Sequence, residues 1–300
     1  MFRTKNHIFL YHAYALPFGG YVRDKNMQFT ALPAIAPSVL PITGGFASAS
    51  EKHVNFSVTG KYLWGLEGPG SFNLYVGHAY SEVRGTVEDG EPGPYGPYVT
   101  TVRSVLDDVR INDDLYIEHS EAILMSMHAN PSNPEPAPEP GVFVGASEMY
   151  GVHIRGAKAT LNKHQAIDQD PVYTTLHSQV RTMLSASVRT GWPINVCNWN
   201  NPSDVLSTDP EYARDYATIN QASQNRLRYS IFEDIDLPAT EGVKKFKSSV
   251  EVDNFGRVFF GEVIASNAMK QLTMFRINLG CDNCGDAGGS GGTTNGGPMP

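Results

Sequence analysis

The sequence has few cysteines, few charged residues and no long hydrophobic run. Three of the 300 residues are cysteine, and Lys, Arg, Asp and Glu together make up 18%. An odd number of cysteines is not typical of a disulfide framework and fits a reducing compartment better. A chain of this length can bury about three-quarters of its surface without disulfides. No run of about 18 apolar residues occurs, which excludes a transmembrane helix.

The charge balance is acidic. Twenty-three Lys and Arg against 31 Asp and Glu give a formal net charge of -8. Nucleic-acid binding needs a basic face, and no stripe of Lys or Arg is present, so we expect no nucleic-acid partner. Residues 1–20 contain Arg3 and Lys5 but no continuous apolar core, so we predict no Sec signal. The compartment stays open between the cytoplasm and export by a non-Sec route.

The usual signatures of catalytic and metal sites are also missing. The sequence contains no H-E-x-x-H or G-x-x-x-x-G-K-[ST] pattern, and its G-x-S-x-G match at residues 288–292 lies in the glycine-rich tail, where no strand-to-helix elbow is expected. Cys281 and Cys284 have a metal-ligand spacing, but a second ligand pair is missing. We interpret these thiols as free or as a local disulfide, with metal binding or redox chemistry as the alternatives. We therefore predict no catalytic residue, no metal and no cofactor.

Proline and glycine are concentrated in three segments. Residues 1–50 contain the run Leu32-Pro-Ala-Ile-Ala-Pro and the pair Gly44-Gly45, which cannot lie inside a helix or a central strand. We interpret them as an extended arm or a packed loop with apolar anchors. Residues 130–141 hold five prolines and predict an exposed connector, and the low-complexity residues 285–300 predict a flexible glycine-rich tail.

Residues 51–284 predict one mainly β domain, an antiparallel sandwich or a barrel-like body. Apolar and polar residues alternate in several segments, which is typical of half-buried strands. A two-helix insertion is expected at about 165–228. Its first helix begins at Asp170-Pro171, and its second covers about 209–225, where apolar residues recur at helical spacing.

One hairpin can be placed in register from the sequence. Residues 99–111 and 115–127 both alternate, and the loop Asn112-Asp113-Asp114 separates them. A three-residue loop pairs Ile111 with Leu115, whereas a two-residue loop would place Ile111 opposite an aspartate. We therefore predict the three-residue loop.

That register places charged residues opposite each other. Asp107 is then opposite His119, and Arg103 is diagonal to Glu121; we expect all four on the apolar face. A carboxylate can orient an imidazole for general base catalysis. Because Ser104 and Ser120 fall on the other face, no nucleophile is evident. An ion-paired patch is the favoured interpretation, and a hydrolase using the Asp/His pair is the weaker alternative.

An aromatic loop is the candidate binding site. Flat indole faces beside amides can stack on a sugar ring and bind its hydroxyls, although indoles that cap the core would give the same pattern. The candidate ligand-binding residues are Trp192, Asn195, Asn198, Trp199 and Asn200.

Several segments carry a family resemblance. They include Leu40-Pro-Ile-Thr-Gly-Gly, Phe72 to Tyr80, Phe143-Val-Gly, Phe255-Gly-Arg-Val-Phe and Leu272 to Cys281. Together these segments resemble a widespread bacterial family of uncharacterised proteins that ends in a glycine-rich tail. More distantly, their order is similar to the surface proteins called choice-of-anchor P. The resemblance implies a β-rich, non-enzymatic protein and supplies no site residues.

These observations favour a structural function. We expect a non-enzymatic, self-assembling β-rich protein that makes protein–protein contacts through its N-terminal arm, as a homo-oligomer or with a protein partner. The alternative is carbohydrate or small-ligand binding through the aromatic loop.

Overall fold

The structure is a computed structural model that is mainly β. It describes residues 9–23, 29–60, 70–87, 97–129, 141–144, 146–163, 227–265, 270–279 and 285–298. These residues form seventeen strands in two antiparallel sheets of nine and eight strands. The prediction of an antiparallel, mainly β fold is confirmed, and the two sheets do not close into a barrel.

The first sheet has nine strands in the order β13-β14-β15-β16-β17-β1-β2, with β11 paired to β15 and β3 paired to β1. Its strands are β1 (Phe9–Arg23), β2 (Phe29–Ile35), β3 (Ser38–Val39), β11 (Leu227–Ser230), β13 (Val243–Lys245), β14 (Ser249–Val252), β15 (Gly256–Ala265), β16 (Lys270–Asn278) and β17 (Gly285–Pro298).

The second sheet has eight strands in the order β12-β10-β9-β7-β6-β5-β4, with β8 paired to β7. Its strands are β4 (Gly45–Gly60), β5 (Gly70–Val87), β6 (Pro97–Ile111), β7 (Leu115–Ala129), β8 (Gly141–Phe143), β9 (Glu148–Ile154), β10 (Ala157–Lys163) and β12 (Phe232–Asp236).

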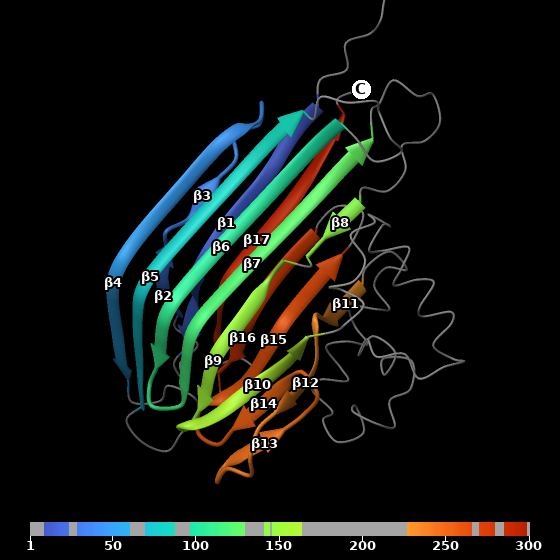
Figure 1. The fold of residues 1–300 in the computed structure, drawn as a ribbon. Helices are drawn as coiled ribbons and strands as arrows, with labels where there is room; N and C mark the ends of the chain where they lie inside the picture. Colours follow the sequence, from blue (N-terminus) through green and yellow to red (C-terminus); the bar gives the residue numbers. More distant parts are fainter. Residues whose placement is uncertain are drawn as a thin grey trace, which may run out of the picture.

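The two sheets pack face to face around one core. Strands β1 and β17 lie across β5, β6 and β7 (Figure 1). Phe18 and Phe275 from the first sheet and Leu106 and Ile117 from the second are fully buried members of a single apolar cluster. The alternating residues of β5, β6 and β7 supply one wall of this core, as the sequence pattern predicts.

The glycine-rich C-terminal segment is a central strand, so the prediction of a flexible tail is wrong. Strand β17 pairs with β16 on one side and with β1 on the other. A Cβ on Gly289 would lie 2.3 Å from the Phe275 ring and 2.7 Å from Leu106 Cδ1. Glycine is therefore needed here because side chains of the neighbouring strand β16 and of β6 in the facing sheet fill the space in front of the backbone.

The N-terminal residues are also part of the sheet rather than a separate arm. Strand β1 lies between β17 and the pair β2 and β3. Leu32, Ile35 and Leu40 are buried, which confirms the apolar anchors. Pro33 is tolerated in β2 because this strand lies at an edge of the sheet.

A line of kinks crosses the second sheet. The strand pairing aligns His53, Gly77, Asp108, Glu118 and Gly151 in one row across β4, β5, β6, β7 and β9. In alternate strands of that row, His53, Asp108 and Gly151 have φ of 53°, 52° and 64°. The long strands bend part-way along their length (Figure 1). Because every strand changes at the same row, the register between strands is kept.

The kinks shift which residues face the core. In β6 the buried residue Leu106 is followed by Val109, three residues later, whereas simple alternation would give a spacing of two. The same break occurs in β5 between Val76 and Ala79, and in β7 between Ile117 and Ser120. Two consecutive residues therefore point away from the core at each crossing.

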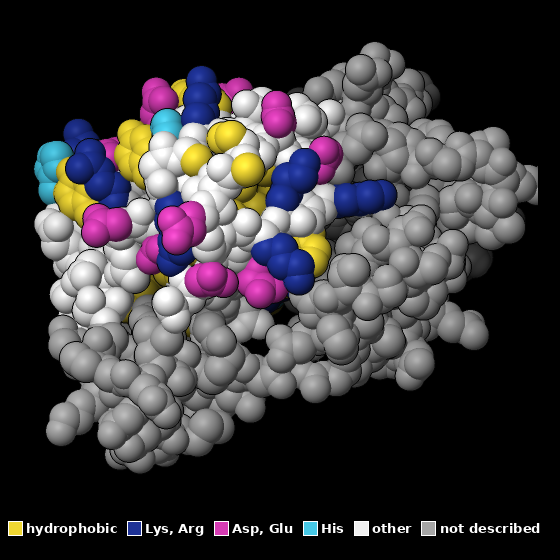
Figure 2. Space-filling view, turned by 90° about the horizontal axis from the view of Figure 1, so that it is seen from below, with side chains coloured by type: hydrophobic (Ala, Val, Ile, Leu, Met, Phe, Trp, Pro, Cys, Tyr) yellow, Lys and Arg dark blue, Asp and Glu magenta, His cyan; other side chains and the backbone are white. Residues whose placement is uncertain are grey.

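At one end of the molecule an arginine joins the two sheets. Arg155, in the turn between β9 and β10, forms an ion pair with Asp114 at 3.0 Å. Its guanidinium also donates to the backbone oxygens of Glu241, Gly242 and Asp253. These residues lie before β13 and between β14 and β15, at the ends of strands of the first sheet. The view from below shows charged side chains of both signs interspersed with small apolar patches (Figure 2).

The remaining predictions about organisation concern residues outside those described. Residues 165–226 of the predicted helical insertion lie outside the described residues, and residues 227–228 belong to β11. The described residues contain no helix at all, and so none with the length and hydrophobicity that a membrane crossing requires. Most of the predicted connector at 130–141 also lies outside the described residues.

Candidate functional site

A row of polar side chains crosses the outer face of the second sheet beside the kinks. Asp107 on β6 accepts hydrogen bonds from His78 Nδ1 on β5 at 3.0 Å and from His119 Nδ1 on β7 at 2.6 Å. Although burial alone raises the pKa of Asp107, the hydrogen bonds from His119 and His78 hold it below its usual value. Asp107 therefore stays ionised and fixes both imidazole rings.

The predicted hairpin register is confirmed. Ile111 pairs with Leu115 across a three-residue turn, and Asp107 pairs with His119. The diagonal contact also exists, because Arg103 Nε donates to Glu121 Oε1 at 2.5 Å.

The predicted face of these residues is wrong. Asp107 and His119 lie on the side of the sheet opposite to the core, because the kink at Asp108 turns two consecutive residues outward. Asp107 keeps 39% of its side chain exposed and His119 keeps 15%. Ser104 and Ser120 lie on the other face, as predicted, and both are fully buried.

Strand β4 adds a serine that sequence reasoning missed. Ser50 Oγ lies 3.2 Å from His78 Nε2. Ser50, His78 and Asp107 thus follow the order of nucleophile, base and orienting carboxylate in a hydrolase triad. Such a hydrolase also needs N–H donors aimed at the developing oxyanion. In a sheet the N–H groups lie in the plane of the strands, whereas these side chains stand above it.

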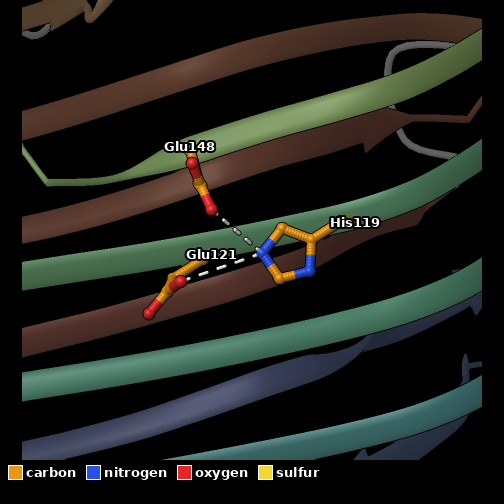
Figure 3. A group of neighbouring side chains, drawn as sticks. All are labelled: His119, Glu121 and Glu148. Atoms are coloured by element: carbon orange, nitrogen blue, oxygen red, sulfur yellow. Dashed lines mark ion pairs between the residues drawn. The ribbon is translucent and has the colours of Figure 1, made fainter.

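On its other side, His119 is enclosed by two glutamates. His119 Nε2 lies 3.8 Å from Glu121 Oε2 and 3.6 Å from Glu148 Oε1 (Figure 3). The Tyr150 ring stacks on the imidazole at a centroid distance of 4.8 Å. His119 Nε2 is buried and has no hydrogen-bond partner among the described residues. The imidazole thus directs an unused nitrogen toward two carboxylates.

The sequence contains one clue to this arrangement. The apolar alternation Val102, Leu106 changes phase before Val109, and Asp107 and Asp108 lie at the break. A phase break in several neighbouring strands predicts an outward-facing polar row. The partners Ser50 and Glu148 could not be found in this way, because they come from strands whose pairing the hydrophobic pattern does not specify.

A separate pocket of about 450 Å³ opens where β4, β5 and β6 end. The Arg110 guanidinium lies over the Tyr75 ring at 5.5 Å, and Asn112 Oδ1 accepts a hydrogen bond from the Asn73 backbone at 2.9 Å. The full lining is Asn55, Phe56, Ser57, Asn73, Leu74, Tyr75, Arg110 and Asn112. Aromatic rings beside amides can bind a small polar ligand such as a sugar.

The aromatic loop predicted as the binding site lies outside the described residues. This holds for Trp192, Asn195, Asn198, Trp199 and Asn200, and likewise for Cys281 and Cys284. Their predicted roles stay predictions.

Comparison with known proteins identifies a family but no activity. A family model described as "Domain of unknown function (DUF8256)" matches residues 9–266. No curated protein and no solved structure matches the chain. The match includes the strands that carry the polar row and the pocket, and ends before β16.

Proposed function

We propose that this chain, which belongs to the family described as "Domain of unknown function (DUF8256)", is a non-enzymatic structural protein. It assembles with further copies of itself through residues 1–50. The observation that carries this proposal is the first half of β4, an edge strand of the second sheet that pairs only with β5 among the residues that the structure describes.

Strand β4 divides into two unlike halves at the kink. The second half begins with Lys52 and with His53 at positive φ, and both features hinder edge-to-edge pairing. The first half, residues 45–50, reads Gly-Phe-Ala-Ser-Ala-Ser and contains no charge and no proline. Its exposed backbone groups are a template for another strand.

A two-fold axis through Ser48 gives a self-complementary register. Ser48 then lies opposite Ser48 of the second copy, Ala47 opposite Ala49, and Phe46 opposite Ser50. No like charges meet, because Glu51 falls opposite a glycine. A dimer of this kind has the closed two-fold symmetry that most homo-oligomers use.

Apolar side chains beside this edge favour the same contact. Val39, Ile42 and Phe46 are 66%, 59% and 52% exposed. All three lie in the short stretch that leads from β3 into β4, within the predicted N-terminal contact region. Exposed apolar side chains this close together in the sequence favour a protein–protein contact in this stretch.

A charge placed on this edge tests the proposal. Ser48→Lys puts two ammonium groups at the proposed two-fold axis, so we expect the oligomer to dissociate into monomers. Asn55→Lys puts the same charge on an exposed position of the second half of β4 and should leave assembly unchanged. Light scattering after size-exclusion chromatography measures both. Equal masses for the two variants would refute the proposed edge.

A second candidate function is carbohydrate or small-ligand binding. The pocket beside Tyr75 and Arg110 favours it, and the aromatic loop with Trp192 and Trp199 is the location predicted from the sequence. A glycan panel read by intrinsic fluorescence tests it. Loss of a response in Tyr75→Ala assigns the pocket, and loss in Trp192→Ala or Trp199→Ala assigns the loop. A panel without any response contradicts this candidate.

A further inference from the structure

We propose that His119, Glu121 and Glu148 bind one divalent transition-metal ion, of the class that includes zinc and manganese. This proposal is independent of assembly through β4. The three side chains each offer one ligand atom, and these atoms lie within 4.8 Å of one another. Figure 3 shows all three pointing toward the same space above β7 and β9.

The distances match those of a metal site. Zinc binds nitrogen and carboxylate oxygen at about 2.0–2.2 Å, so ligand atoms of a tetrahedral site are separated by roughly 3.4 Å. His119 Nε2 lies 3.6 Å from Glu148 Oε1 and 3.8 Å from Glu121 Oε2. Glu148 has 58% of its side chain exposed, so little packing opposes an inward rotation. Three protein ligands leave a fourth position for water.

The strand pairing brings two carboxylates together, and Arg103 pairs with only one of them, through Oε1 of Glu121. Glu121 on β7 pairs directly with Glu148 on β9. Like charges directly opposite on antiparallel strands are destabilising. Only 11% of the Glu121 side chain is exposed, so water screens it poorly. A cation between the carboxylates removes this repulsion and also gives the buried, unpartnered His119 Nε2 a ligand role.

The two less exposed ligands are held by outer partners. Asp107 accepts from His119 Nδ1 and thereby leaves the Nε2 lone pair directed at the glutamates. Arg103 binds Oε1 of Glu121 and leaves Oε2 facing His119. Metal-binding histidines typically donate their second ring nitrogen to a carboxylate, and such outer partners affect metal affinity by about 10–100-fold.

The donor set indicates the class of metal. Calcium and magnesium prefer oxygen ligands only, whereas imidazole suits zinc, iron, nickel and copper, and carboxylates suit manganese. One imidazole with two carboxylates therefore favours a first-row transition metal.

Isothermal titration with Zn²⁺ tests the site in a full-length chain stripped of metal. Cys197, Cys281 and Cys284 are replaced by Ser first, because thiolates also bind zinc. We expect one site that Glu148→Gln weakens by at least about 10-fold and Asp107→Asn by about 10–100-fold. Glu118→Gln is the matched control, because it removes an exposed carboxylate next to His119 that is not a ligand.

A second readout keeps the test decisive. Zn²⁺ should raise the melting temperature of the parent and of Glu118→Gln, but not that of Glu148→Gln. If the cysteine-free chain does not fold, Mn²⁺ binding to the unmodified chain replaces zinc, because manganese disfavours thiolates. No binding by the parent, or equal affinities for Glu148→Gln and Glu118→Gln, would overturn the proposal.

Discussion

Single side chains on the outer face of the second sheet form a continuous network. It runs from Ser50 through His78 and Asp107 to His119 and links four neighbouring strands with the glutamates at its end. Asp107 is its centre, since it accepts from both imidazoles. Because more than a third of the Asp107 side chain is exposed, water screens these contacts and their main effect is to orient the rings.

The sequence contains part of this network. Alternation and loop length predict the pairing of Asp107 with His119, because both are local properties of one hairpin. Ser50 and Glu148 depend on how β4 and β9 join the sheet, which is decided by packing among distant segments. The predicted face of Asp107 and His119 was wrong because Asp108, a residue at positive φ, reverses the alternation of inward and outward side chains in β6.

His128 is a buried histidine with a pH-dependent effect on stability. It lies at the end of β7, 8% exposed, with its ring 5.0 Å from the Phe9 ring. Desolvation, together with the charge of Lys270, lowers the pKa of His128 to about 4 from 6.5. The unfolded chain therefore binds a proton at a higher pH than the folded chain does.

We predict that acid destabilises the protein through His128. Between pH 6.5 and about 4 the unfolded state carries the extra proton, so the free energy of unfolding falls by up to about 3 kcal/mol. Urea unfolding at pH 7.5 and pH 4.5 measures this loss. His128→Phe should lose less stability over the same interval. An identical loss in both proteins would contradict the assignment.

At the scale of strands, β17 is the element that sequence reasoning missed. Glycine has low strand propensity and provides no apolar alternation, so the pattern indicates a flexible segment. The strand is stabilised by its neighbours: its backbone pairs with β1 and β16, and the side chains of Phe275, Leu106 and Val102 occupy the space in front of its glycines.

Substitutions at two glycines of β17 test whether the packing requires glycine or merely tolerates it. Gly289→Ala places a methyl group within 2.4 Å of Phe275 Cε1, so we expect a loss of about 1–3 kcal/mol in the free energy of unfolding. Gly291→Ala meets nothing closer than 3.5 Å and should leave stability unchanged or raise it by up to about 1 kcal/mol. Denaturant unfolding compares them. Equal effects would show that β17 does not pack against Phe275.

The kinks act as one element across several strands. A single residue at positive φ in one strand would break its pairing with its neighbours. Here residues at positive φ lie in the same row in β4, β6 and β9, and β5 and β7 shift their burial pattern at that row, so the pairs on either side stay aligned. The row turns Asp107 and His119 outward together, and the proposed metal site depends on it.

For the whole molecule, the predicted mainly β fold class is correct. The arrangement of the strands in two sheets cannot be derived from the alternation of apolar and polar residues. Alternation in the segments that form β4 to β7 is enough to predict an antiparallel β protein. Two sheets with β1 and β17 side by side require contacts between the two ends of the chain. Such pairings depend on the tertiary fold rather than on local sequence.

The mass of the protein in solution tests the central proposal most directly. The chain has a mass of 32.8 kDa. Light scattering of the full-length protein over a range of concentrations should give at least twice that value, and Ser48→Lys should return it to that of a single chain. A mass of one chain at every concentration of the unmodified protein would contradict assembly through the β4 edge.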